Sequence, residues 1–216
     1  MATTLDALAA RRRDVSVKSL LLGSGPRFVR DSVGPVLAFY LGWKWIGLPT
    51  GVVAATLVTI VAYVWERRHA RTGVAATVGL TIALAQAAAG LATGSARWFF
   101  APAVLVNAGY GAAFIVSALL GRPLAGVFAQ ETYPFPPELK ASATFRRVFG
   151  RVSLAWGTYL LLRSGLRWLT LARGDVELIV VVNLLSGVPF TAALMTWSVW
   201  YGVRGFQRSE EWAGRA

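Results

Sequence analysis

The chain has 216 residues, 56% of them hydrophobic, and a mean hydropathy of +0.54. This composition is too apolar for an ordinary soluble domain, so we expect a single membrane domain. The sequence has no cysteine, which excludes disulfides, thiol nucleophiles and thiolate metal sites, and its single histidine excludes a multi-histidine metal site.

The sequence is also strongly basic, with a net charge of +12. In a soluble protein such an excess would indicate nucleic-acid binding. Here most Lys and Arg residues flank apolar segments, where they set the orientation of membrane helices and contact anionic lipid. We therefore expect the lipid bilayer, with its anionic lipids, as the partner of this chain, and no nucleic acid.

The first 30 residues form a polar, basic leader. Its only apolar patch, Ser19 to Leu22, is too short for the core of a signal peptide, so we expect no cleavage. Its arginines and serines are also compatible with an organellar transit peptide. The interpretation adopted here is a cytoplasmic arm that lies on the membrane surface.

The stretch from Leu48 to Arg71 indicates that the chain lies in a lipid membrane. It carries no charge from Gly51 to Trp65 and then ends in Glu66-Arg67-Arg68. An apolar run with a basic end is typical of a membrane-spanning helix whose basic end faces the cytoplasm. Before it we expect a short span at residues 31–46, anchored by Trp and Lys at its end, and a Gly-Pro turn at 47–51.

Four further spans are predicted after this one. The apolar pattern predicts helices at residues 72–92, 99–120, 148–171 and 176–203, and turns with glycine separate them. The first of the four is rich in small residues, which predicts close packing inside the bundle. Residues 121–150 form the longest segment outside the membrane, because their prolines forbid a continuous helix.

The predicted fold class is therefore all-α, a polytopic bundle of six transmembrane helices with both termini in the cytoplasm. With six spans, seventeen of the 22 Lys and Arg residues fall on the cytoplasmic side. A five-span variant, in which the first helix is only half inserted, is the main alternative. The predicted organisation is a leader at 1–30, a transmembrane domain at 31–205 with a cytoplasmic loop at 121–150, and a cytoplasmic tail at 206–216.

Three short motifs give the chain a resemblance to a known family. They are Leu119-Leu120-Gly121-Arg122-Pro123-Leu124, Phe145-Arg146-Arg147-Val148-Phe149 and Leu154-Ala155-Trp156-Gly157. A helix that ends in G-R-P-L, a polar loop and a basic helix start leading into L-x-W-G resemble the bacterial intracellular septation protein A family and its actinobacterial relatives, over residues 31–205. The resemblance implies a non-enzymatic, multi-pass protein of the bacterial plasma (inner) membrane that serves envelope integrity or division.

Polar side chains inside lipid need a physical reason, because each is costly there. At about 1.5 Å per helical residue, several fall in one mid-to-outer slab of a core about 30 Å thick. We hypothesise that they converge into one ligand-binding pocket. In the alternative, the amides bond neighbouring helices and the charged groups extend outward to the membrane surface. The residues of the hypothetical pocket are Lys44, Gln86, Asn107, Tyr159, Arg163 and Asn183.

No carboxylate occurs in the middle of a predicted span, which argues against a proton relay or a cation carrier. A site with Lys44, Arg163 and Arg167 would instead favour an anion such as a lipid phosphate. In the alternative, Asp175 or Glu177 folds back and neutralises Arg167. A small carrier or channel for an anionic or amphiphilic solute, with its site at Arg163, is accordingly the second functional hypothesis.

The third hypothesis is a membrane-embedded enzyme that modifies lipid. Glu66 and His69 share a helix face at i and i+3 and would act as acid and base, so Glu66 is the catalytic candidate. A stop signal with local ion pairs explains the same two residues. No phosphate-binding loop, metal motif or serine-nucleophile elbow occurs, so we expect no metal and no cofactor.

Contacts to lipid headgroups or to a partner are expected from the 121–150 segment. The residues are Arg122, Pro123, Arg146 and Arg147. For Arg122 and Pro123 the alternative is an ordinary helix end, where arginine meets the helix dipole and proline blocks continuation. The protein partners expected for the chain are a second copy of itself, in a homodimer, or other envelope proteins.

Overall fold

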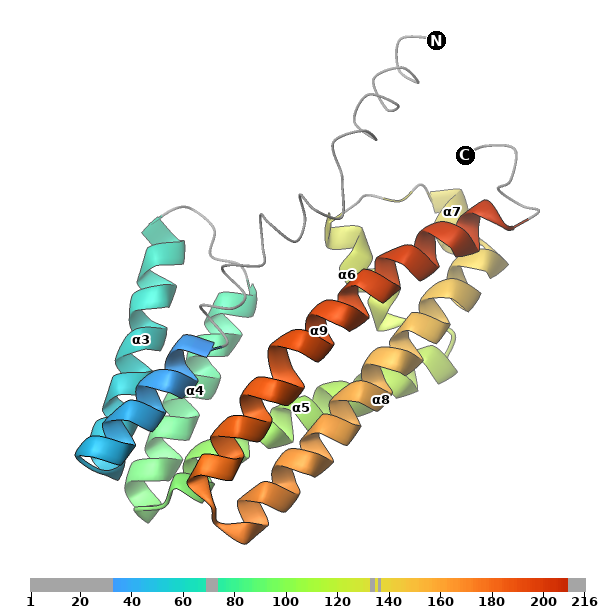
Figure 1. Cartoon of the computed structure of the whole chain (residues 1–216). Coiled ribbons are helices and arrows are strands. Elements are labelled where there is room, and N and C mark those ends of the chain that lie inside the picture. The colour runs from blue at the N-terminus through green and yellow to red at the C-terminus, as the bar shows by residue number, and fades with distance from the viewer. Residues whose placement is uncertain (1–32, 69–73, 133–134, 136, 210–216) are drawn as a thin grey trace. The chain divides into compact units, whose positions relative to one another are not determined.

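The computed structural model describes residues 33–68, 74–132, 135 and 137–209. Regular structure in these residues is helical throughout, which confirms the all-α fold class. The chain divides into two compact units, Met1–Ala83 and Leu84–Ala216. The helices, drawn in Figure 1, are one at 33–45, α3 (Leu48–Arg68), α4 (Val74–Thr93), α5 (Ala96–Leu119), α6 (Leu124–Thr132), α7 (Pro137–Ala141), α8 (Ala143–Arg173) and α9 (Val176–Gln207).

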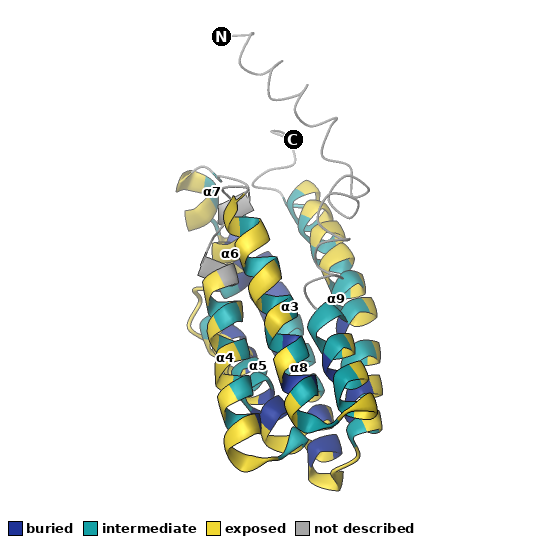
Figure 2. Ribbon diagram, turned by 90° about the vertical axis from the view of Figure 1, so that its left-hand side faces the viewer, coloured by how far each residue is buried: buried dark blue, intermediate teal, exposed yellow. Residues whose placement is uncertain are grey.

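Three of these helices, α3, α5 and α9, are long and apolar enough to cross a membrane. Residues Thr77–Thr93 of α4 form a shorter apolar helix. Exposed residues, yellow in Figure 2, recur along the labelled helices, and many of them are large and apolar. Such surfaces are expected to face lipid rather than water. The total of six spans and the cytoplasmic position of both termini stay predictions.

In the first unit, the helix at 33–45 and α3 form a hairpin whose backbones are in contact. A Cβ atom on Gly42 would lie 2.9 Å from the Cα atom of Gly51, and one on Gly51 would lie 2.7 Å from the carbonyl oxygen of Phe39. The turn contains Gly47, whose φ of 132° favours glycine. Glycines at facing positions thus allow the close approach that is common between membrane helices.

The second unit is organised around α8, which packs against α5 and α9 and has α6 and α7 at one end (Figure 1). Helices α5 and α8 are antiparallel and cross at Gly111 and Gly157, where a Cβ atom on Gly157 would lie 2.8 Å from the carbonyl oxygen of Gly111. Helix α8 ends at Gly174, which is left-handed, and α9 follows with Asp175 as its N-cap. This sharp turn makes α8 and α9 antiparallel neighbours.

The segment 121–150 is mostly helical, since α6, α7 and the first turns of α8 occupy it. Its prolines prevent one continuous helix, as expected, but short helices form in the segment. Helix α7 begins at Pro137, and the first turn of a helix tolerates proline because its N–H groups have no partner within the helix. The segment is therefore a packed part of the second unit.

The G-R-P-L motif forms the junction between α5 and α6. The N–H groups of Gly121 and Arg122 donate to the carbonyl oxygens of Ala118 and Ser117, at 3.1 and 3.0 Å. With Gly121 at a φ of 71°, this is a Schellman ending. The motif that carries the family resemblance thus has a structural explanation, because it ends one helix and positions the next.

Serine hydroxyls from two other helices cap the beginning of α6. Ser117 on α5 accepts a hydrogen bond from the N–H of Leu124, and Ser153 on α8 accepts one from the N–H of Ala125, both at 3.0 Å. Ser153 is completely buried. Side chains therefore satisfy the first N–H groups of α6, which fixes this short helix on α5 and α8.

Aromatic residues pack where α8 begins and α9 ends. The rings of Phe145 and Phe149 on α8 have centroids 4.5 Å apart, and the Phe149 ring lies 5.8 Å from Phe135 and 6.1 Å from Phe206 on α9. Contacts between aromatic rings add to the stabilisation from buried apolar area. This cluster holds the basic start of α8 against the end of α9.

Candidate functional site

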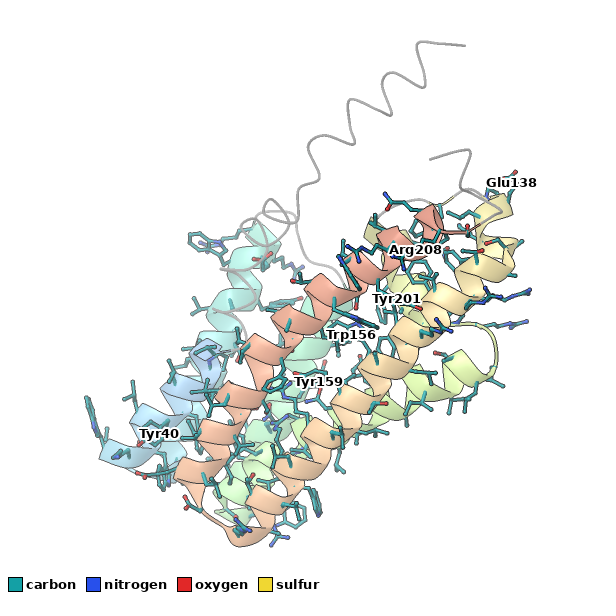
Figure 3. The ribbon with its side chains drawn as sticks, turned by 45° about the vertical axis from the view of Figure 1, so that its right-hand side comes forward. Tyr40, Glu138, Trp156, Tyr159, Tyr201 and Arg208 are labelled. Atoms are coloured by element: carbon teal, nitrogen blue, oxygen red, sulfur yellow. The ribbon has the colours of Figure 1, made fainter. Side chains whose placement is uncertain are left out.

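A line of polar side chains joins α8 to α9. Near the end of α9, Arg151 donates to the hydroxyl of Tyr201 at 2.8 Å, and the Trp156 indole donates to the hydroxyl of Ser198 at 3.0 Å. Figure 3 shows Tyr159, Trp156 and Tyr201 in succession along the two helices. We call this line the α8–α9 seam: Arg151, Trp156, Tyr159 and Arg163 on α8, with Asn183, Ser186, Thr191, Ser198 and Tyr201 on α9.

Tyr159 is the central residue of the seam. Its hydroxyl donates to the carbonyl oxygen of Ser186 at 2.7 Å and lies 2.9 Å from the hydroxyl of Thr191. These contacts fall in the part of α9 that contains Pro189, where proline removes one hydrogen bond of the helix. Near Pro189 the hydrogen bonding within α9 is incomplete, and Tyr159 on α8 provides polar contacts to this part of α9.

Arg163 lies one turn further along α8 and is partly buried. Its Nη2 lies 3.3 Å from the carbonyl oxygen and 3.4 Å from the Oδ1 atom of Asn183, and its Nε lies 3.3 Å from the Ser186 hydroxyl. A Cβ atom on Gly187 would lie 2.8 Å from Nη2, so glycine at this position leaves room for the guanidinium. All of these acceptors are neutral, and the contacts are at the long end of the hydrogen-bond range.

Arg167, the next arginine along α8, is buried with 4% of its surface exposed. Its Nε atom has no hydrogen-bond partner among the residues that the structure describes, and neither does the hydroxyl of Ser164, which is equally buried. The side chain of Arg167 therefore lies inside the unit rather than on its surface. Asp175 instead caps α9 by accepting from the N–H of Leu178.

The structure brings three of the six proposed pocket residues together, namely Tyr159, Arg163 and Asn183. Gln86 on α4 and Asn107 on α5 are both partly buried, and no hydrogen bond within the described part of the chain joins either side chain to this group. Lys44 belongs to the first unit, where its Nζ donates to the hydroxyl of Tyr40 at 2.8 Å and lies over that ring. Ligand binding by any of the six stays a prediction.

The catalytic candidate Glu66 lies in the last turn of α3, and its predicted partner His69 falls outside the described residues. No group of three acidic or histidine residues able to hold a metal ion occurs in the described ranges. An acid and base pair at this helix end stays a prediction.

The residues proposed for headgroup or partner contact lie at the end of the second unit where α6 and α7 pack. Arg122, Arg146 and Arg147 are exposed, whereas Pro123 is buried within the junction of α5 and α6. Close to them on α9, Arg204 stacks on Trp200 with 4.3 Å from Cζ to the ring centroid. The position of Pro123 assigns it a structural role, while the arginines remain available for contact.

Three hydroxyls near the site were not predicted from the sequence, those of Ser164, Ser186 and Thr191. Residue spacing nevertheless gives a signal for part of the site. Tyr159, Arg163 and Arg167 recur every four residues and therefore share one face of α8. Asn183 and Ser186 are three residues apart, so they share a face of α9 as well.

Comparisons with known proteins identify the family of this chain. No curated protein and no solved structure matches the chain. One family model, described as "Protein of unknown function (DUF3159)", matches residues 22–209. This match does not test the resemblance to septation protein A, which stays a prediction. Because the match extends over most of the sequence, the chain belongs to the DUF3159 family.

Proposed function

We propose that this protein is a non-enzymatic integral protein of the bacterial plasma membrane that acts through anionic lipid and partner proteins at one basic end. The observation that carries the proposal is the uneven distribution of charge over the second unit. At the opposite end, where α5 begins and α8 turns into α9, the basic residues are Arg97 and Arg173. The exposed basic residues at the proposed contact end are Arg122, Lys140, Arg146, Arg147, Arg151, Arg204 and Arg208.

The spacing of these charges fits a bilayer. Arg151 and Arg173 lie on the same helix, α8, about 33 Å apart along its axis. The hydrocarbon core is about 30 Å thick, so both ends of this interval would reach the interfaces. On α9, Trp197, Trp200 and Tyr201 lie near the basic end, as aromatic residues commonly do at a membrane interface. The excess of positive charge supports a cytoplasmic position for this end.

A role in envelope integrity or division, as the resemblance to septation protein A implies, remains part of the proposal. Its support is the compact form of the basic end, where the aromatic cluster and the Ser117 and Ser153 caps fix α6 on the longer helices. A rigid surface of this kind presents its arginines in a fixed arrangement. Such an arrangement suits contact with lipid phosphates or with an acidic partner protein.

The orientation of the second unit can be measured with single cysteines, because the sequence contains none. Lys140 and Arg173 are exposed at opposite ends of the unit. In intact cells we expect a membrane-impermeant maleimide to label Arg173→Cys and to leave Lys140→Cys unlabelled until the membrane is permeabilised. The reverse pattern would place the basic end outside and contradict the proposal.

The lipid contact is tested by removing two charges from the basic end. We expect Arg146→Gln/Arg147→Gln to retain phosphatidylglycerol about thirtyfold more weakly than wild type in native mass spectrometry, because each of the two basic residues contributes about 1 kcal/mol near a membrane surface. The matched control is Arg97→Gln/Arg173→Gln, which removes two exposed charges from the other end. Equal losses in the two variants, or none, would show that the basic end is not a specific contact.

A further inference from the structure

We infer that Arg167, Ser164 and Arg163 form a binding site for an oxyanion, a phosphate or carboxylate group, within the membrane-spanning part of the second unit. The site is separate from the basic end and does not depend on the function proposed for it. Arg167 lies about 9 Å along α8 from Arg173, which marks one end of the proposed membrane interval. Arg163 lies a further 6 Å toward the middle, again by helix rise.

Two arginines one helical turn apart lie inside the bundle, and one of them is almost completely buried. A buried cation without a partner is costly, and a second cation nearby increases that cost. Neither arginine makes an ion pair with a carboxylate of the described residues, and the partners of Arg163 are neutral atoms of Asn183 and Ser186. The described chain therefore leaves the charge of this site uncompensated.

Buried polar atoms in folded proteins nearly always have partners, so two neighbouring exceptions need an explanation. The Nε atom of Arg167 and the hydroxyl of Ser164 are both buried and both unpartnered among the described residues. They are three residues apart on α8, which places them on one face of the helix. A single bound group that accepts hydrogen bonds would satisfy both atoms.

The hydrogen-bond donors of this site indicate the class of ligand. A guanidinium offers several donors in one plane and no acceptor, and it binds the two oxygens of a phosphate or carboxylate together. A serine hydroxyl adds one further donor. Leu162 and Leu166, on the same stretch of α8, are exposed and would face lipid. The ligand that suits these surroundings is an anionic group attached to an apolar chain, and a phospholipid headgroup is the first source to test.

The test uses the purified full-length protein and two probes, phosphatidylglycerol and inorganic phosphate. Phosphatidylcholine serves as the zwitterionic comparison. We expect wild type to retain phosphatidylglycerol in native mass spectrometry and Arg167→Gln to bind it about tenfold more weakly, as expected for loss of a charge-assisted hydrogen bond. Arg173→Gln removes an exposed arginine of the same helix and should bind as wild type does. Stabilisation by inorganic phosphate alone would identify a soluble anion as the source and would also support the site.

Two milder substitutions keep the inference testable if Arg167→Gln does not fold. Ser164→Ala removes one donor and should weaken binding severalfold, whereas Arg167→Lys keeps the charge, loses the planar fork and should weaken binding by a similar factor. The inference is overturned if wild type, Ser164→Ala and Arg167→Lys bind both anionic probes equally. It is also overturned if wild type binds phosphatidylcholine as tightly as phosphatidylglycerol. Loss of binding in Arg146→Gln/Arg147→Gln but not in these variants would assign the lipid to the basic end instead.

Discussion

Replacing Gly157 by valine is expected to destabilise the second unit by about 3 kcal/mol or to prevent its folding. A Cβ atom at this position would lie 2.5 Å from Cγ1 of Ile115 and 2.8 Å from the carbonyl oxygen of Gly111. The Ile115 side chain can rotate, but the carbonyl belongs to the backbone of α5 and cannot move independently. The two helices would therefore have to separate along their main contact. The other helices of the unit pack around this contact.

Gly165→Val on the same helix provides the matched control. Gly165 has no atom within 4 Å of a Cβ placed on it, so the added side chain meets open space. Both substitutions are glycine to valine within α8, and they have the same effect on intrinsic helix propensity. The midpoint of thermal unfolding in detergent should fall strongly for Gly157→Val and change little for Gly165→Val. Equal changes would show that the crossing at Gly111 is not a close contact in the protein.

The turns of this fold could be predicted from the sequence, because glycine has a specific role in each. Gly47, Gly94, Gly121 and Gly174 all have positive φ, and each lies between two of the predicted helices. Such backbone geometry is strained for other residues, so glycine after an apolar run is a direct signal of a helix end. For this reason, the predicted ends of the helices agree with those of the structure to within a few residues.

The short helices of the 121–150 segment could not be predicted from the sequence, because they depend on contacts with distant residues. Proline was interpreted as forbidding a continuous helix, which is correct for the segment as a whole. Short helices between prolines depend on contacts from elsewhere in the chain, and α6 is held by Ser117 and Ser153 from two other helices. No local pattern shows that two distant serines will provide these caps.

The depth of the polar residues in the membrane could be predicted from the sequence, but the direction in which each side chain points could not. Helical rise alone places Gln86, Asn107, Arg163 and Asn183 at similar levels of a bilayer. In lipid, however, both the packed and the lipid-facing sides of a helix are apolar, so the sequence does not show which way each polar residue points. Arg163 and Asn183 meet because α8 and α9 are joined by a sharp turn at Gly174. Within the described residues, no hydrogen bond joins the side chain of Gln86 or Asn107 to them.

Replacing Gly51 by valine is expected to open the hairpin of the first unit. The described part of the first helix, 33–45, is about 20 Å long, which is less than the roughly 30 Å of a hydrocarbon core. We expect the contact with α3 to hold this described part of the helix in place. A Cβ on Gly51 would lie 2.7 Å from the carbonyl oxygen of Phe39, so valine must open the contact between backbones.

The opening can be detected with one cysteine at Ala55, which is 3% exposed and lies one turn after Gly51 on the same face of α3. We expect Ala55→Cys alone to react slowly with a thiol reagent, and Ala55→Cys/Gly51→Val to react at least about tenfold faster, since opening becomes easier by more than about 1.4 kcal/mol. Gly79→Val is the control, because a Cβ there meets no atom within 4 Å. Equal rates in all three proteins would mean that the first helix is held by something other than its contact with α3. A selective increase would show that the close backbone contact at Gly51 keeps the described part of the first helix beside α3, which is long enough to cross the membrane.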